Sequence, residues 1–268
     1  MPDHCCHCNN ENKATAETVP AEPADDTFEA NYAIDCKQEI STEFIKQCLP
    51  GDIHVSDLKV IPEQKMVGIV SNAAPSLIIE AFQAHGMDAI LRGSGKSNSS
   101  AVCILEDFGK NGNKTTYADS QIQGLVRIVQ IKDDGGDNAT MFDISLRGNI
   151  PAGEYVVSIN ESGDISQGLE STGGTFYEFK GRTLQCKVAP TPGLGRGLVS
   201  AHAFWGAPVK TWEIIGRSFV VRNLSTGTGL GGIIARSAGA WENDKQVCAC
   251  SGKTVWEERE DAKKININ

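Results

Sequence analysis

The chain has 268 residues, with 25 Lys or Arg against 34 Asp or Glu, so its formal net charge is −9. This length suits one large domain or two small ones. Without a Lys/Arg block, the acidic balance argues against nucleic-acid binding, which depends on neutralising phosphates. The lack of a long apolar run argues against an integral membrane segment.

The cysteine count and the start of the chain predict a cellular compartment. The first residues are polar and acidic, unlike a secretory signal. Nine cysteines in such a chain indicate reduced thiols, suited to metal or redox chemistry rather than to a disulfide scaffold. We therefore expect a cytoplasmic protein, and a minor fraction in the mitochondrial intermembrane space stays open.

Residues 1–27 lack apolar periodicity and are predicted to be a disordered tail. The tail carries a dense block of metal-ligating side chains, namely His4, Cys5, Cys6, His7 and Cys8. Three thiols and two imidazoles within five residues favour binding of Cu(I) or zinc. The alternative is a disordered tail with incidental cysteines.

Residues 28–93 show the pattern β-α-β-β-α-β, which predicts a ferredoxin-like domain. Its strands are expected over 31–34, 53–60, 65–70 and 88–91. Ser41 can cap the first helix, and Pro75 begins the second. The second helix is expected to bury one face, formed by Leu77, Ile78, Ala81, Phe82 and His85. Residues 94–100 are rich in Gly and Ser and predict a flexible linker.

Over residues 101–236 the apolar pattern changes to a period of two. Strands are expected over 101–105, 124–131, 141–146, 154–159, 176–179, 212–222 and 233–235. Short strands with long connections predict an all-β Greek-key barrel or an antiparallel sandwich. Residues 237–268 form a polar tail, so both termini are expected to be flexible.

Three segments near the C-terminus resemble the fungal copper chaperones for superoxide dismutase, namely Gly231–Gly239, Trp241–Cys250 and Gly252–Arg259. Ile214–Val221 resembles the matching strand of the Cu,Zn superoxide dismutases and of their chaperones. The resemblance implies a heavy-metal-associated domain followed by a dismutase-like barrel. It also implies that the chain carries copper to a Cu,Zn superoxide dismutase and promotes disulfide formation in that client.

The barrel lacks the side chains of a dismutase site. Such a site needs about six histidines and an aspartate for its two metals, whereas residues 101–236 contain one histidine, His202. By the resemblance, the copper-ligand positions fall at Ser158, Asn160, Thr175 and Arg222, and the subunit disulfide would join Leu169 to Gly231. We expect a recognition domain without zinc rather than an enzyme; residual dismutase activity is the alternative.

The resemblance also indicates a surface for the client. Dismutase subunits pair through the strand that corresponds to the one carrying Ile215, Gly216 and Arg217 in this chain. These residues are therefore expected to bind a dismutase subunit in a heterodimer. Ordinary barrel packing of the three residues is the alternative, and a homodimer stays open.

Cys248 and Cys250 in the tail are expected to hold the copper. Cu(I) is soft and prefers few thiolate ligands, and residues i and i+2 of an extended chain point the same way. A disulfide between them would be strained and readily reduced, so it could oxidise a client dithiol. A metal-independent thiol oxidant that binds a dismutase stays as a further alternative. Trp241 and Trp256 flank the pair and dock either on a partner or on their own domain.

The first domain lacks the Met-x-Cys-x-x-Cys motif of its family. Cys36 stands at the Met position, and Gln38 and Ser41 replace the two cysteines. Cys36 is either a single thiol ligand or inert, and Cys48 and Cys103 are expected in the core. We expect the N-terminal His/Cys block to take over copper acquisition from the lost pair.

Overall fold

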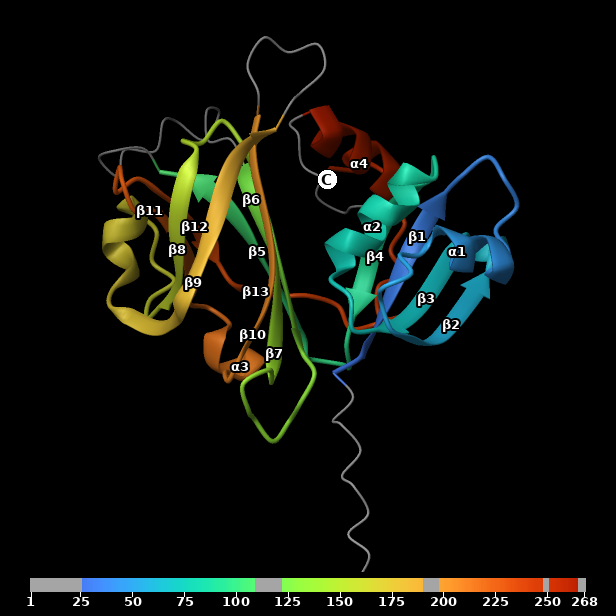
Figure 1. Cartoon of the computed structure of the whole chain (residues 1–268), viewed down its shortest axis with the longest axis horizontal. Helices are drawn as coiled ribbons and strands as arrows, with labels where there is room; N and C mark the ends of the chain where they lie inside the picture. The colour runs from blue at the N-terminus through green and yellow to red at the C-terminus, as the bar shows by residue number, and fades with distance from the viewer. Residues whose placement is uncertain (1–25, 109–121, 190–197, 248–250, 265–268) are drawn as a thin grey trace, which may run out of the picture.

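The computed structural model describes residues 26–108, 122–189, 198–247 and 251–264. Figure 1 shows two domains, with the barrel on the left and the smaller domain on the right. In the described part of the chain, no helix is both long and apolar enough to cross a bilayer.

The first domain has the predicted ferredoxin-like order of elements. An antiparallel sheet with strand order β2-β3-β1-β4 carries both helices on one face. Its elements are β1 (Phe28–Asp35), α1 (Thr42–Cys48), β2 (Val55–Ile61), the 3-10 turn η1 (Pro62–Gln64), β3 (Met66–Ser71), α2 (Pro75–Ala84) and β4 (Asp88–Ser94). The predicted cap of α1 is confirmed, because the Ser41 side chain accepts a hydrogen bond from the Phe44 N–H at 3.2 Å.

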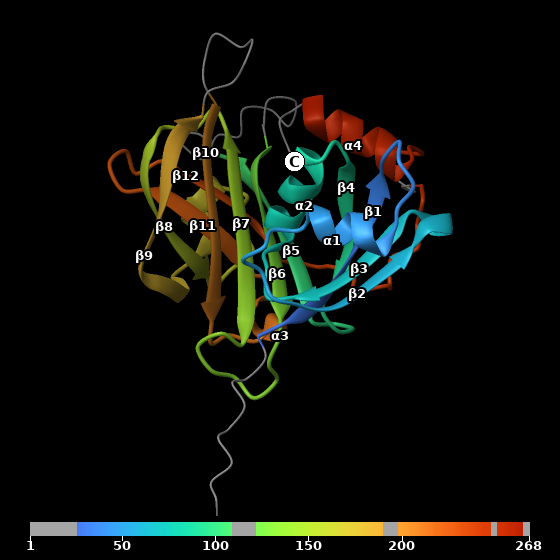
Figure 2. The same ribbon diagram turned by 45° about the vertical axis from the view of Figure 1, so that its right-hand side comes forward.

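The predicted buried face of α2 is wrong at two positions, because Leu77 and His85 are both exposed. Leu77 is 40% exposed, whereas Ile79 is buried together with Ile78 and Phe82. Figures 1 and 2 show the reason, since α2 lies between its own sheet and the barrel strand β7 (Thr140–Gly148). A helix covered from two sides buries more than one narrow stripe.

The second domain is the predicted all-β barrel. Its order is β12-β11-β8-β9-β10-β7-β6-β5-β13, and pairing of β12 with β5 closes it. Besides β7, its elements are β5 (Ser100–Asp107), β6 (Ile122–Gln130), β8 (Gly153–Asn160), the 3-10 turn η2 (Gly168–Thr172), β9 (Thr175–Ala189), β10 (Leu198–Ala207), α3 (Thr211–Ile214), β11 (Ser218–Asn223), β12 (Gly229–Ile233) and β13 (Ala235–Arg236). Phe142 lies at the centre of its core, 5.1 Å from Phe179 and 6.1 Å from Phe219 between ring centroids.

Two parts of the barrel differ from the prediction. The strand expected over 212–222 is wrong at its start, where the chain forms the short helix α3 and then turns at Gly216, whose φ is +82°. The strand β10 was not predicted, because its Ala, Ser and Gly residues have weak strand preference. It forms because its backbone pairs with β7 from Val199 to Ala207.

The linker between the domains is shorter than expected, and the C-terminal tail is more ordered than expected. Ser94 already belongs to β4 and Ser100 to β5, so the expected linker 94–100 is a short turn; within it, the Gly95 N–H donates to the Glu29 carbonyl at 2.7 Å. The C-terminal tail contains a helix, α4 (Val255–Lys264), and its described residues are held against the first domain. That contact is a tertiary interaction, which no local pattern in the tail indicates.

A buried carboxylate joins the two domains. Asp143 of β7 accepts hydrogen bonds from the N–H of Ser76 at 2.9 Å and from its hydroxyl at 2.6 Å, at the first turn of α2. Arg127 of β6 lies 3.6 Å from the same carboxylate, and only 2% of the Asp143 side chain is exposed. Burial raises the pKa of Tyr32 in β1, and the charge of Asp143 adds to that rise. A negative charge at a helix N-terminus is favourable, so Asp143 fixes α2 to the barrel.

Candidate functional site

The four positions to which the resemblance assigns copper ligands lie on the neighbouring strands β8, β9 and β11. Asn160 pairs with Thr175, and Ser158 pairs with Val220 of β11. The Ser158 hydroxyl donates to Asn160 Oδ1 at 2.8 Å, and Asn160 Nδ2 donates to the Thr172 hydroxyl, also at 2.8 Å. Neutral hydroxyl and amide groups that bond one another form a structural network here and are poor ligands for copper.

The fourth of these positions, Arg222, turns to the backbone of its own hairpin, where its guanidinium donates to the Gly227 carbonyl at 3.4 Å. Among the described residues, no group of three or more His, Cys, Asp and Glu side chains could hold a metal ion.

Packing occupies the place that the resemblance assigns to a disulfide. Leu169 of η2 lies against both Gly229 and Gly231 of β12, so close that a Cβ on either glycine would overlap its side chain. Leu169 and Gly231 are therefore neighbours, as the resemblance implied. This contact packs Leu169, and with it η2, against β12 of the barrel.

The three residues expected to bind a partner lie in the turn between α3 and β11 rather than on a strand. Arg217 is fixed in three ways: its Nε donates to the Glu213 carbonyl at 2.7 Å, its Nη1 donates to the Glu161 carbonyl at 2.8 Å, and its guanidinium carbon lies 3.9 Å from the Phe176 ring centroid. The Gly216 N–H donates to the Ile234 carbonyl at 2.9 Å. This turn is thus rigid on the surface of the barrel.

Two residues that sequence reasoning missed belong to the same surface. Gly163 packs directly on the Gly216 carbonyl, and Ile233 of β12 approaches Gly163 with 42% of its surface exposed. We call this surface, where the resemblance implies that a partner would bind, the partner face; it is formed by Gly163, Ile215, Gly216, Arg217 and Ile233. No sequence signal links its members, because closure of the barrel brings three separate segments together.

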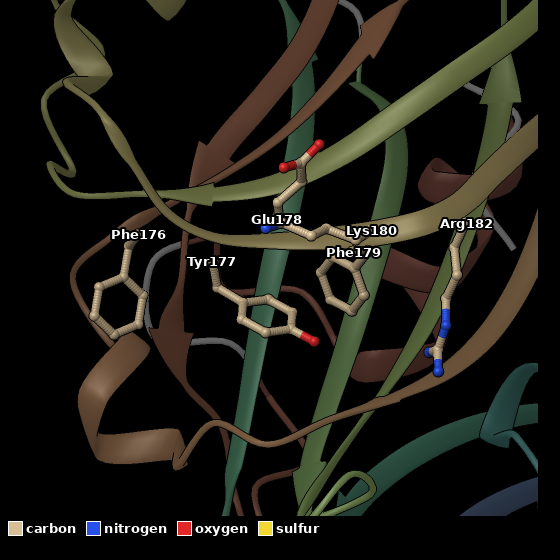
Figure 3. A pocket seen from close by; sticks show the side chains of 6 residues that line it. All are labelled: Phe176, Tyr177, Glu178, Phe179, Lys180 and Arg182. Atoms are coloured by element: carbon tan, nitrogen blue, oxygen red, sulfur yellow. The ribbon is translucent and has the colours of Figure 1, made fainter.

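A hollow of about 440 Å³ lies along β9 next to the partner face. Figure 3 shows Tyr177, Phe179 and Arg182 on one side of the strand and Glu178 on the other. Arg182 donates to the Gly206 carbonyl at 2.9 Å and lies 6.0 Å from the Trp205 ring centroid. The hollow is thus lined by aromatic rings and by side chains of both charges.

The first loop of the ferredoxin-like domain uses its polar groups internally. The Cys36 thiol donates to the Gln38 carbonyl at 2.9 Å, and Ser41 caps α1. Cys48 is buried as predicted, and burial, with the neighbouring Cys36, raises its pKa. A raised pKa keeps the Cys48 thiol protonated and weakens it as a metal ligand.

The two cysteines of the barrel are also buried. Burial raises the pKa of Cys103 to about 12 and that of Cys186 to about 11. The core position predicted for Cys103 is confirmed, and Cys186 lies in β9 rather than in a loop. Both thiols therefore stay protonated near neutral pH and are suited to packing rather than to exchange.

The residues expected to bind copper lie outside the described residues: Cys248 and Cys250 in the tail, and His4, Cys5, Cys6, His7 and Cys8 at the N-terminus. The structure does describe the chain on either side of the tail pair. Val247 and Thr254 form an antiparallel bridge, and the Val255 N–H donates to the Gln246 carbonyl at 3.0 Å.

Comparison with known proteins covers both domains of this chain. No family model matches it. The superoxide dismutase 1 copper chaperone of Candida glabrata is 45% identical over 243 residues, which span 90% of this chain and 98% of that protein. The protein of the same name from Saccharomyces cerevisiae is 45% identical over 252 residues, with the same coverage of both chains. The chain belongs to the copper chaperones for superoxide dismutase.

More distant members of this chaperone family match as well, and the human copper chaperone for superoxide dismutase is 26% identical over 85% of this chain. The resemblance inferred from the C-terminal segments is therefore confirmed, and so are both fold classes. Around the positions that the resemblance singled out, Ser158 and Asn160 are hydrogen-bonded to each other, Arg217 is hydrogen-bonded within its turn, and Trp241 holds the tail on the first domain.

Proposed function

We propose that this chain binds Cu(I) and delivers it to a Cu,Zn superoxide dismutase. The observation that carries the proposal is its kinship, since relatives named superoxide dismutase 1 copper chaperone are 41–45% identical to it over 90% of its length. The hydrogen-bonded Ser158, Asn160 and Thr172 support a barrel that recognises the client and does not bind zinc or catalyse dismutation itself.

In this proposal Cys248 and Cys250 hold the copper as thiolates. Two sulfur ligands close together suit a soft ion that must be both bound and released. The same pair, when oxidised, can pass its disulfide to the client. One client thiolate attacks a tail sulfur to give a mixed disulfide, and the second client thiolate then displaces the tail. Two electrons move from the client to the tail, which leaves as a dithiol.

The partner face supports docking of the barrel on a dismutase subunit as a heterodimer. It combines a rigid backbone around Gly216 with the exposed side chain of Ile233 and the fixed cation of Arg217. If the barrel matches a dismutase subunit in shape, as the resemblance implies, the two can pair as dismutase subunits pair. A homodimer through this face would compete with the client.

The double variant Cys248→Ser/Cys250→Ser is expected to abolish activation of a reduced, copper-free dismutase by the Cu(I)-loaded chaperone. Cys36→Ser, the same replacement in the first-domain loop, should retain activation. Activity, disulfide state and mixed disulfide are followed in one anaerobic turnover, with the tail reduced for copper delivery or oxidised for disulfide transfer. Copper binding that survives loss of both tail thiols would favour a thiol-oxidant scaffold, and superoxide consumption by the loaded chain alone would favour a residual enzyme.

We also propose that the N-terminal block His4–Cys8 acquires copper in place of the lost loop motif. Residues 9–27 can reach roughly 24 Å as a random coil, enough to pass over the first domain. Deleting residues 1–8 is expected to lower the bound Cu(I) by roughly one ion per chain, because three thiols are lost. Copper per chain is measured after loading under a fixed excess of competing chelator. Unchanged stoichiometry contradicts this substitution of one site for another.

A further inference from the structure

The C-terminal tail covers the face of the first domain's sheet that the helices leave open. The Trp241 ring lies on Gly68 of β3, where a Cβ would overlap it, and Lys59 Nζ of β2 lies 4.8 Å from the ring centroid. The Trp241 backbone N–H donates to Asn31 Oδ1 of β1 at 3.1 Å, and its indole N–H donates to the Glu29 carboxylate. One tryptophan thus contacts three neighbouring strands.

The edge strand β4 holds the next part of the tail. Arg92 donates to the Asn243 carbonyl at 3.2 Å and also to the Lys245 carbonyl. Gly93 lies so close to Gly239 that a Cβ would overlap its carbonyl. Asn31 is 1% exposed and Arg92 5% exposed, although both are polar. Buried polar side chains are retained where they find partners, and several of these partners are tail atoms.

A third contact fixes α4 to the start of β4. The Arg259 guanidinium donates to Asp88 Oδ1 at 3.2 Å through two of its nitrogens, and Lys263 Nζ lies 2.6 Å from Asp88 Oδ2. Burial alone would raise the pKa of Asp88, but hydrogen bonds from Lys263 and Arg259 hold it below its ordinary value. Asp88 is also the register partner of Asp35, which precedes Cys36, so α4 is anchored at the end of the sheet where the altered loop begins.

These contacts hold the tail on both sides of its thiol-bearing segment. Lys245 is held by Arg92 before that segment, and Arg259 is held by Asp88 after it. Between the anchors, the bridge from Val247 to Thr254 brings the two ends together. Both ends are therefore fixed to the first domain.

We propose that the first domain of this chaperone is the positioning platform of its C-terminal thiol segment, with Trp241, Arg92 and the Asp88–Arg259 pair as positioning residues. This inference rests on the proposed role of Cys248 and Cys250. It assigns a role to a domain that keeps its fold but lacks the two motif cysteines that bind Cu(I) in its family. The contacts of Trp241, Arg92 and Arg259 keep the tail on the first domain, which raises the effective concentration of the tail at a client docked on the barrel.

Gly68→Ala tests the platform, with Gly51→Ala as the matched control. The added methyl at Gly68 overlaps the Trp241 ring, whereas a Cβ at Gly51 meets nothing within 4 Å. Amide hydrogen exchange of the full-length chain is followed over residues 238–245 and α4. We expect protection of both segments in the wild type and in Gly51→Ala, and exchange at least about tenfold faster in Gly68→Ala over 238–245. Trp241→Ala, which leaves the sheet sequence intact, should give the same result.

A second measurement compares the rates at which the wild type and the two variants activate the client at equal copper content. Release of the tail in Gly68→Ala and Trp241→Ala is expected to slow activation by about tenfold, with client affinity unchanged. Rapid exchange of 238–245 in the wild type overturns the proposal, as does full activation by a variant whose tail is released. If the wild type activates no dismutase while 238–245 stay protected, the proposed function fails but the docking stands.

Discussion

Replacing Asp143 by alanine is expected to lower the free energy of unfolding by about 3 to 5 kcal/mol, the usual cost of removing one partner from a buried charged pair. The Asp143 carboxylate is almost fully buried and accepts both hydrogen bonds from Ser76. Without it, the first turn of α2 loses its acceptor at the interface with the barrel, and Arg127 loses the charge that it faces. Urea denaturation monitored by far-UV circular dichroism measures the change.

Asp133→Ala is the matched control, because the same replacement removes an exposed carboxylate of the barrel. Asp133 lies 3.9 Å from Lys96 and its side chain is 85% exposed. Such a surface pair contributes about 0 to 1 kcal/mol. Ser76→Ala should destabilise the protein less than Asp143→Ala, and the double variant should be about as unstable as Asp143→Ala alone. Equal losses from Asp143→Ala and Asp133→Ala would show that Asp143 does not join the domains.

Ile233→Glu is expected to weaken binding to a copper-free, reduced dismutase by at least about 30-fold, or about 2 kcal/mol. Ile233 is the exposed apolar side chain of the partner face. A carboxylate there would be desolvated on docking without a partner. Because the side chain lies at the surface of the free protein, stability should change by only about 0.5 kcal/mol. Sedimentation velocity or calorimetric titration gives the affinity, and thermal unfolding checks the fold.

Leu224→Glu provides the comparison, since Leu224 is 55% exposed and follows β11 at the end opposite to Arg217. We expect this variant to bind the dismutase as the wild type does. Loss of binding in Leu224→Glu alone would instead indicate that the client binds at the other end of the barrel. Loss of binding in both would point to a general effect of added negative charge on a chain that already carries −9.

Local patterns were sufficient where one segment decides its own structure. Ser41 caps α1 because its side chain reaches an N–H three residues on, and Pro75 begins α2 because its fixed φ suits a first helical turn. The predictions were wrong where residues distant in the sequence determine the local structure. Ile79 is buried in a helix covered from two sides, and β10 is a strand because β7 pairs with it. Gly216 needs a positive φ, so the strand expected over 212–222 begins only at Ser218.

The same distinction, between features set by local sequence and features set by distant contacts, applies to the candidate site. The histidine deficit of the barrel and the cysteines at both ends of the chain are matters of side-chain chemistry. The sequence by itself therefore led to the expectation that the positions assigned by resemblance do not hold copper as a dismutase does. Kinship, too, was visible in the residues of the C-terminal segments. Only the tertiary structure decided that Gly163 and Ile233 join the turn at Gly216, and that Trp241, Arg92 and Asp88 hold the tail on the open face of the sheet. These contacts link residues up to about two hundred positions apart, and burial and hydrogen bonding between such residues depend on the whole fold rather than on any local pattern.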